Sequence, residues 1–91
     1  MSYQLRFTQS YENRAKKFLK CHPEVVRQYQ KTLEILEVNP FHPSLRLQAL
    51  QGRLAGLHSV SINISYRITL EFIIADSTII PVDVGDHDHV Y

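Results

Sequence analysis

Residues 60–72, VSINISYRITLEF, alternate between apolar and polar side chains over thirteen positions. Alternation of this kind is typical of a strand that has one buried face. Thirteen residues is long for a single strand, and the polar residues Asn63 and Ser65 predict a turn at residues 63–65, in its middle. A three-residue loop there pairs Ser61 with Arg67 and keeps the apolar and polar sets on separate faces. The stretch therefore predicts an antiparallel hairpin whose apolar face needs a cover.

Two amphipathic helices upstream can supply that cover. Residues 3–7 have the pattern of a short strand, and Thr8 or Ser10 is suited to cap the helix that follows. The apolar positions of this first helix recur once per turn, at Tyr11, Ala15, Phe18 and Leu19. Pro23 is suited to begin a second helix, which must end before Pro40 because the residue preceding a proline is disfavoured in a helix.

A further strand is predicted after a turn at residues 75–77. The segment TIIPVDV, residues 78–84, is rich in β-branched side chains, and Pro81 within it indicates an edge or a break. The predicted fold class is α+β, with an N-terminal strand and a two-helix hairpin packed on one face of an antiparallel β-meander. Residues 1–91 form a single domain in this prediction. The opposite face is expected to be polar and open, with Arg67 as the only cation from the meander.

The composition is that of an ordinary globular protein. Of the 91 residues, 44% are hydrophobic and 21% are charged. No apolar run approaches the roughly 20 residues of a membrane span, and the N-terminus lacks the apolar block of a signal peptide. Cys21 is the single cysteine, so it cannot form an internal disulfide. We expect a cytoplasmic protein without a membrane partner.

Charge is distributed unevenly along the chain. The formal net charge is only +1, but residues 1–67 hold all ten Lys and Arg with four acidic residues. Residues 68–91 hold five acidic residues and no Lys or Arg. This asymmetry indicates a basic face that could meet an acidic partner.

The chain ends in VDVGDHDHVY, residues 82–91, where groups that titrate near neutral pH follow a strand-like run. Proton transfer or contact with a target is the first interpretation of this tail. Metal binding is the alternative, with His87 and His89 on one side of an extended chain and His58 as a third ligand. Two histidines at this spacing are a weak metal signal, so we predict neither a metal nor another cofactor.

Two segments together resemble a known superfamily. They are LQALQGRLAGLHSVSINISYRITLEF, residues 47–72, and the final VDVGDHDHVY. The matching residues are Leu50, Gly52, Arg53, Leu54, Gly56, Tyr66, Arg67, Ile68, Gly85, His87, Asp88, Val90 and Tyr91. In this order they resemble the pattern of the RelE/ParE superfamily of bacterial type II toxins, which includes plasmid stabilisation toxins. Chain length and element order resemble that superfamily too.

The resemblance implies a toxin held inactive by a cognate antitoxin. In the RelE branch such a toxin is a metal-independent endoribonuclease that cleaves mRNA on the ribosome and inhibits translation. His87 would then act as acid or base and Arg67 would hold the phosphate. Arg53 and Arg46 would bind the RNA backbone, and Tyr91 would stack on a base. The identity of the general base stays open.

Other interpretations stay open beside this one. In the ParE branch the target is DNA gyrase and there is no nuclease activity, and a degenerate member would only bind an antitoxin. His87 could cap the end of the sheet, and Arg67 could pair with Glu71 on its own strand. His58 is interpreted as a partly buried histidine without a catalytic task, and His42 as an exposed loop residue.

Overall fold

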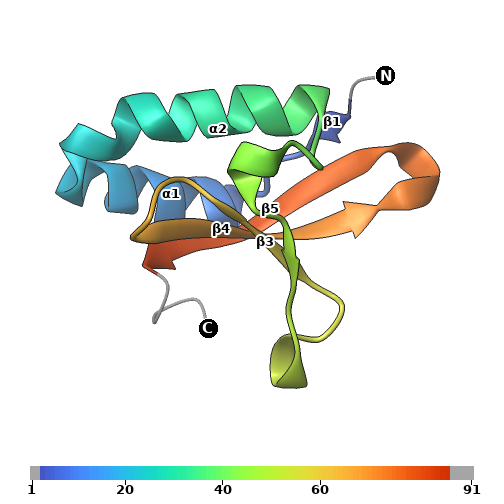
Figure 1. Ribbon diagram of the computed structural model, residues 1–91. Coiled ribbons are helices and arrows are strands. Elements are labelled where there is room, and N and C mark those ends of the chain that lie inside the picture. Colours follow the sequence, from blue (N-terminus) through green and yellow to red (C-terminus); the bar gives the residue numbers. More distant parts are fainter. Residues whose placement is uncertain (1–2, 87–91) are drawn as a thin grey trace.

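The computed structural model describes residues 3–86, and within them five strands form one sheet in the order β1-β5-β4-β3-β2. The strands are β1 (Gln4–Leu5), β2 (Gln48–Ala49), β3 (His58–Ser61), β4 (Tyr66–Ile73) and β5 (Thr78–Asp86). The helices are α1 (Gln9–Cys21) and α2 (Val26–Val38), and the 3-10 turns are η1 (Pro23–Val25), η2 (Pro43–Leu45), η3 (Gly52–Leu54) and η4 (Ile74–Asp76). Figure 1 shows both helices on one side of the sheet. The predicted α+β fold class is confirmed.

The predicted hairpin forms between β3 and β4. Ser61 lies opposite Arg67, and Ile62 donates its backbone N–H to the carbonyl of Tyr66 at 2.9 Å. Within the loop, the side-chain Oδ1 of Asn63 accepts hydrogen bonds from the backbone N–H groups of Ser65 and Tyr66, at 2.8 and 2.9 Å. An asparagine that satisfies two loop donors stabilises the chain reversal through hydrogen bonds within the loop.

The start of α1 and the end of α2 lie close to the predicted residues. Thr8 caps α1, because its Oγ1 accepts a hydrogen bond from the backbone N–H of Tyr11 at 3.1 Å. α2 ends at Val38, and Asn39 is already extended before Pro40. The start of the second helix differs from the prediction. Pro23 opens the 3-10 turn η1, and the α-helical part begins only at Val26.

The last strand has two neighbours, which the sequence did not reveal. β5 pairs antiparallel with β4 and parallel with β1, and the parallel pairing covers only Thr78 and Ile79. The register with β4 shifts beside Pro81, so that Val82 is left as an extra residue in a bulge. Pro81 thus marks an irregularity, as predicted, beyond the point where β1 ends. The short edge strand β2 was not predicted either.

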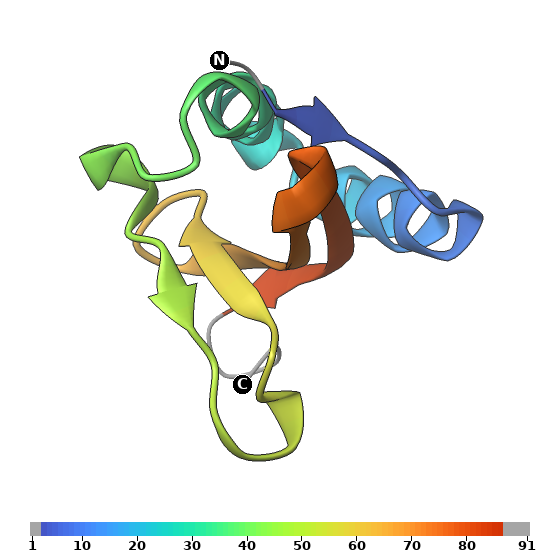
Figure 2. The ribbon, with the colours of Figure 1, turned by 90° about the vertical axis from the view of Figure 1, so that its right-hand side faces the viewer.

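The core lies between the sheet and the two helices. Its fully or nearly fully buried members come from both helices, from η2 and from three strands: Tyr11, Ala15, Tyr29, Leu36, Leu45, Val60, Ile68, Leu70, Ile79 and Val84. No helix among the described residues is long and apolar enough to cross a membrane. Figures 1 and 2 show the loop around η3 projecting from the body of the sheet, away from the helices.

The expectation of an open polar face is wrong over the centre of the sheet. Ser59 and Thr69 point away from the core positions Val60 and Ile68, yet they are only 0% and 3% exposed. Arg67, on the same side, is 9% exposed. One cause is visible in its contacts, because the backbone around Arg46 lies against the Arg67 guanidinium.

Candidate functional site

The polar side of the sheet is assembled from residues that face one another across four strands. Direct cross-strand partners lie on the same face of a sheet. One row runs from β2 to β5 through Gln48, Ser59, Thr69 and Asp83, and the next runs through Ser61, Arg67 and Gly85. These rows bring hydroxyl, amide, carboxylate and guanidinium groups from distant parts of the sequence onto one surface.

Arg67 is held tightly within that surface. Its Nε donates to the Oγ of Ser59 at 3.0 Å, and its Nη2 donates to the carbonyl oxygens of Arg46 at 2.8 Å and Ser59 at 3.4 Å. The Arg46 carbonyl belongs to a residue in the left-handed conformation, with φ of 49°. Arg67 therefore ties β3 and β4 to the segment that leads into β2. Its predicted contact with a phosphate stays a prediction.

Arg46 precedes β2 in the chain, and Arg53 follows it. Both are exposed, and Arg53 is carried by η3 in the projecting loop. Gly52 and Gly56 bound this loop with φ of 69° and 97°, a backbone conformation that suits glycine. A cavity of about 370 Å³ between β2 and η3 is lined by Gln48, Leu50, Gln51 and Leu54. The two arginines are thus accessible to a polyanion, as their predicted role requires.

His87 and Tyr91 lie outside the described residues, so their predicted roles stay predictions. The described chain ends at Asp86, which lies opposite Tyr66, while Gly85 lies opposite Arg67. His87 follows directly in the sequence.

The alternative metal site also depends on His87 and His89, outside the described part. Within residues 3–86, no group of three His, Cys, Asp or Glu side chains could hold a metal ion. The third proposed ligand, His58, has the half-buried position that was predicted, with its ring edge-on to Phe72 at a centroid distance of 5.1 Å. Its buried Nδ1 has no hydrogen-bond partner among the described residues.

His42 is exposed, as predicted, and it has a structural task. Its Nδ1 accepts a hydrogen bond from the backbone N–H of Ser44 at 3.1 Å. This bond caps η2, the turn between α2 and β2.

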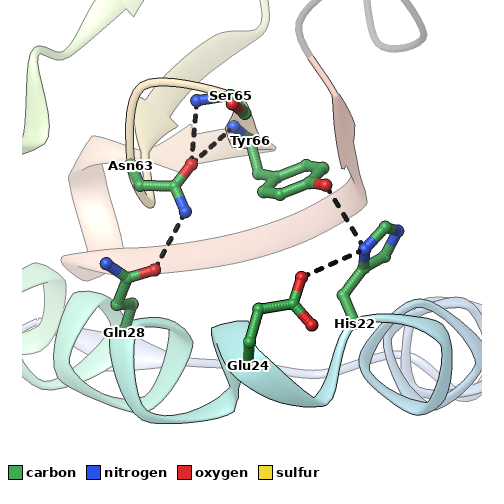
Figure 3. A network of polar contacts seen from close by, with 6 residues as sticks. All are labelled: His22, Glu24, Gln28, Asn63, Ser65 and Tyr66. Carbon is green, nitrogen blue, oxygen red and sulfur yellow. Dashed lines mark hydrogen bonds and ion pairs between the residues drawn. The ribbon is translucent and has the colours of Figure 1, made fainter.

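His22 is a candidate functional residue that the sequence did not reveal. It is the C-cap residue of α1, and its Nδ1 lies 3.3 Å from the hydroxyl of Tyr66 and 3.7 Å from a carboxylate oxygen of Glu24 (Figure 3). The Phe18 ring completes the cluster, 4.8 Å from the His22 ring and 5.2 Å from the Tyr66 ring. Histidine and tyrosine are 44 residues apart in sequence, so no local pattern could have linked them.

A buried polar pair lies between the helices. The hydroxyl groups of Tyr11 and Tyr29 are 2.8 Å apart. Burial raises the pKa of Tyr11 far above its usual value, with a smaller contribution from Tyr29. Burial also raises the pKa of Tyr29, while the hydrogen bond from Tyr11 acts in the opposite direction. The pair is neutral at physiological pH and holds α1 against α2.

Comparisons with known proteins identify the fold. No protein-family model matches the sequence, and no curated protein matches it. Solved structures do match along the whole chain. A chain of the toxin-antitoxin complex RelBE2 from Mycobacterium tuberculosis is 20% identical, with 96% of this chain and 100% of that chain covered and a TM-score of 0.71. The chain has the RelE/ParE toxin fold.

Two further structures agree with the RelE/ParE fold. The YoeB/ParE toxin from Agrobacterium tumefaciens is 17% identical over 92% of this chain and 98% of that chain, with a TM-score of 0.72. The protein HP0894 from Helicobacter pylori is 20% identical over 100% of both chains, with a TM-score of 0.74. At these identities the RelE/ParE fold is shown, and the chemistry of this chain must be argued from its own residues.

Proposed function

We propose that this protein is the toxin of a bacterial type II toxin-antitoxin system and a metal-independent endoribonuclease that cleaves mRNA on the ribosome. The observation that carries the proposal is the full-length fold match to toxins, including a chain of a toxin-antitoxin complex. The protein would act in the cytoplasm, where ribosomes and mRNA are found, and would be neutralised by a cognate antitoxin.

RNA cleavage without a metal needs three tasks to be done. One group takes the proton of the 2′-hydroxyl, donors stabilise the charge that develops on the phosphate, and an acid protonates the leaving 5′-oxygen. His87 is the proposed acid or base, because the unperturbed pKa of a histidine side chain lies near neutral pH. Tyr91 is proposed to stack on a base of the single-stranded message.

The arginines would supply the positive charge. Arg46, before β2, and Arg53, after it, are both exposed and could bind the RNA backbone. Arg67 is the candidate for holding the scissile phosphate, and its bonds to Ser59 and Arg46 would keep the guanidinium in one orientation. A fixed orientation favours catalysis, since a preorganised charge needs no rearrangement as the reaction proceeds.

Primer extension on mRNA from cells that express the chain tests this proposal. Cleavage within translated codons is expected for the natural sequence and is expected to be lost in His87→Ala. Intact transcripts in cells whose growth is blocked would rule out the nuclease. Co-expression of a small gene that lies beside the gene for this protein tests for the antitoxin, because a cognate antitoxin should restore growth.

A second candidate is a gyrase inhibitor that does no RNA chemistry. The burial of Arg67 favours it, because an arginine whose described bonds go to Ser59 and Arg46 already has a structural task. In that case persistent complexes of gyrase with cleaved DNA should accumulate in expressing cells. His87→Ala should then remain toxic, whereas the ribonuclease proposal expects this variant to be harmless.

A further inference from the structure

A cavity of about 530 Å³ lies between α1 and the end of β5. It is lined by Asp83 and Val84 of β5 and by Arg14, Lys17, Phe18, Cys21 and His22. The last five belong to α1 or to its C-cap, at spacings that place them along one side of the helix. Cavities that bind small organic ligands have volumes of roughly 300 to 1,000 Å³, so this one could hold a single nucleotide.

The charges around the cavity favour an anion. Arg14 lies 3.9 Å from the Asp83 carboxylate, and the same carboxylate accepts a hydrogen bond from the backbone N–H of Val84 at 2.9 Å. The negative charge of Asp83 is therefore already balanced by Arg14 and by the backbone N–H of Val84. Lys17 is exposed and adds a second cation, so positive charge exceeds negative charge at the cavity wall.

Aromatic rings form another part of the wall. Phe18 and His22 line the cavity, and the Tyr66 ring contacts both rings, at centroid distances of 5.2 and 4.9 Å. Figure 3 shows the His22 ring held through one nitrogen by Tyr66 and Glu24, with its other nitrogen directed away from both. A ring fixed in this way is a suitable surface for a nucleobase, because stacking costs little further ordering.

The cavity also lies near the end of the sheet where the proposed chemistry belongs. Tyr66 is the direct partner of Asp86, the last described residue before His87. We propose that this cavity is a subsite for one nucleotide of single-stranded RNA, with the phosphate at Lys17 and Arg14 and the base against Phe18 and His22. The inference rests on the proposed function for the identity of the RNA.

Cys21 makes the subsite measurable. It is the single cysteine of the sequence, it is exposed, and it lines the cavity. Its alkylation by iodoacetamide, followed by mass spectrometry, should slow as the ribodinucleotide ApA is added, and the protection should saturate. One phosphate contact predicts that ApA affinity falls about two- to threefold between 50 and 200 mM salt.

Substitutions in the cavity wall test whether ApA protects Cys21 by binding in this cavity. Lys17→Glu should weaken ApA protection about tenfold, because an attraction to the phosphate is replaced by a repulsion. His22→Ala should weaken it through loss of the ring. Lys31→Glu is the matched control, since Lys31 is an exposed lysine on α2 outside the cavity lining, and it should leave protection unchanged. Each variant is compared with and without ApA, so that changes in thiol reactivity cancel.

Three results would overturn the assignment. Equal protection by adenosine alone would show that no phosphate is recognised, and equal protection by inorganic phosphate would show an anion site without base contact. Stronger protection by a Glu-rich peptide would identify an acidic protein segment as the ligand. The assay contains no ribosome, so ApA binding without mRNA cleavage in cells would overturn the proposed nuclease and leave the subsite standing.

Discussion

Arg67 is a buried side chain whose structural task can be tested apart from its proposed role in catalysis. Its bonds to Ser59 and to the Arg46 carbonyl would all be lost in Arg67→Ala, leaving buried acceptors without their donor. We expect the free energy of unfolding to fall by about 2–4 kcal/mol. Urea denaturation of the variant and of the natural sequence measures this difference in the free energy of unfolding. Arg53→Ala removes an exposed arginine and should change stability by less than about 0.5 kcal/mol. Equal effects of the two substitutions would contradict the structural role.

The Tyr11–Tyr29 pair predicts a pH dependence at the alkaline end. Because burial raises the pKa of both phenols in the folded state, the unfolded chain loses these protons first as pH rises. Their contribution to stability is complete below the unfolded pKa of about 10 and is lost above it, by up to about 1.4 kcal/mol per pH unit for each tyrosine. Urea denaturation between pH 8 and 11 measures the slope.

The double variant Tyr11→Phe/Tyr29→Phe is the control for that slope. It removes both phenols together, so neither hydroxyl is left buried without its partner. Its stability should be less sensitive to alkaline pH than that of the natural sequence. An unchanged slope would assign the alkaline transition to other groups.

At the scale of elements, the β3–β4 loop depends on one asparagine. Asn63→Ala removes the acceptor for the backbone N–H groups of Ser65 and Tyr66 and should lower the free energy of unfolding by about 1–2 kcal/mol. Asn63→Asp keeps an acceptor oxygen and loses only the donation to Gln28, an exposed contact of 2.9 Å. Its cost should be smaller, at about 0.5 kcal/mol. If thermal and urea unfolding gave both variants the same stability, the loop bonds would not be the cause.

The elements that sequence predicted correctly are those whose signals are local. Thr8 caps the helix that starts beside it, Pro40 ends the helix before it, and the loop of residues 63–65 closes on itself. The elements that were missed depend on partners far along the chain. Nothing near β2 shows that it will pair with β3, and nothing near Arg67 shows that the Arg46 backbone will cover it.

The same distinction applies to the candidate site. Arg53 could be proposed because it stands in a recognisable glycine-containing pattern, and Arg46 because it lies just before that pattern; both are exposed. His22 could not be proposed, since its connection to Tyr66 exists only after α1 has packed beside the sheet. Candidates that arise from tertiary contact have to be found in the structure.

At the scale of the whole molecule, the chain closes by joining its first strand to its last. Gln4 lies beside Thr78, more than 70 positions later, and its backbone N–H donates to the carbonyl of Ser77 at 2.8 Å. Loop closure over such a distance has a high entropic cost. We therefore infer that β1 joins the sheet late in folding, after the local hairpin of β3 and β4 has formed.

Gln4→Pro tests this order, because proline removes the donor of the Gln4–Ser77 bond while Gln4 itself is an exposed side chain. The variant should lose about 1–3 kcal/mol of stability. Gln4→Ala keeps the backbone N–H and should lose less than about 0.5 kcal/mol. A bond that forms after the transition state affects the unfolding rate, so stopped-flow chevrons should show faster unfolding of Gln4→Pro with an almost unchanged folding rate. A slower folding rate with unchanged unfolding would instead place the β1–β5 pairing in the folding nucleus.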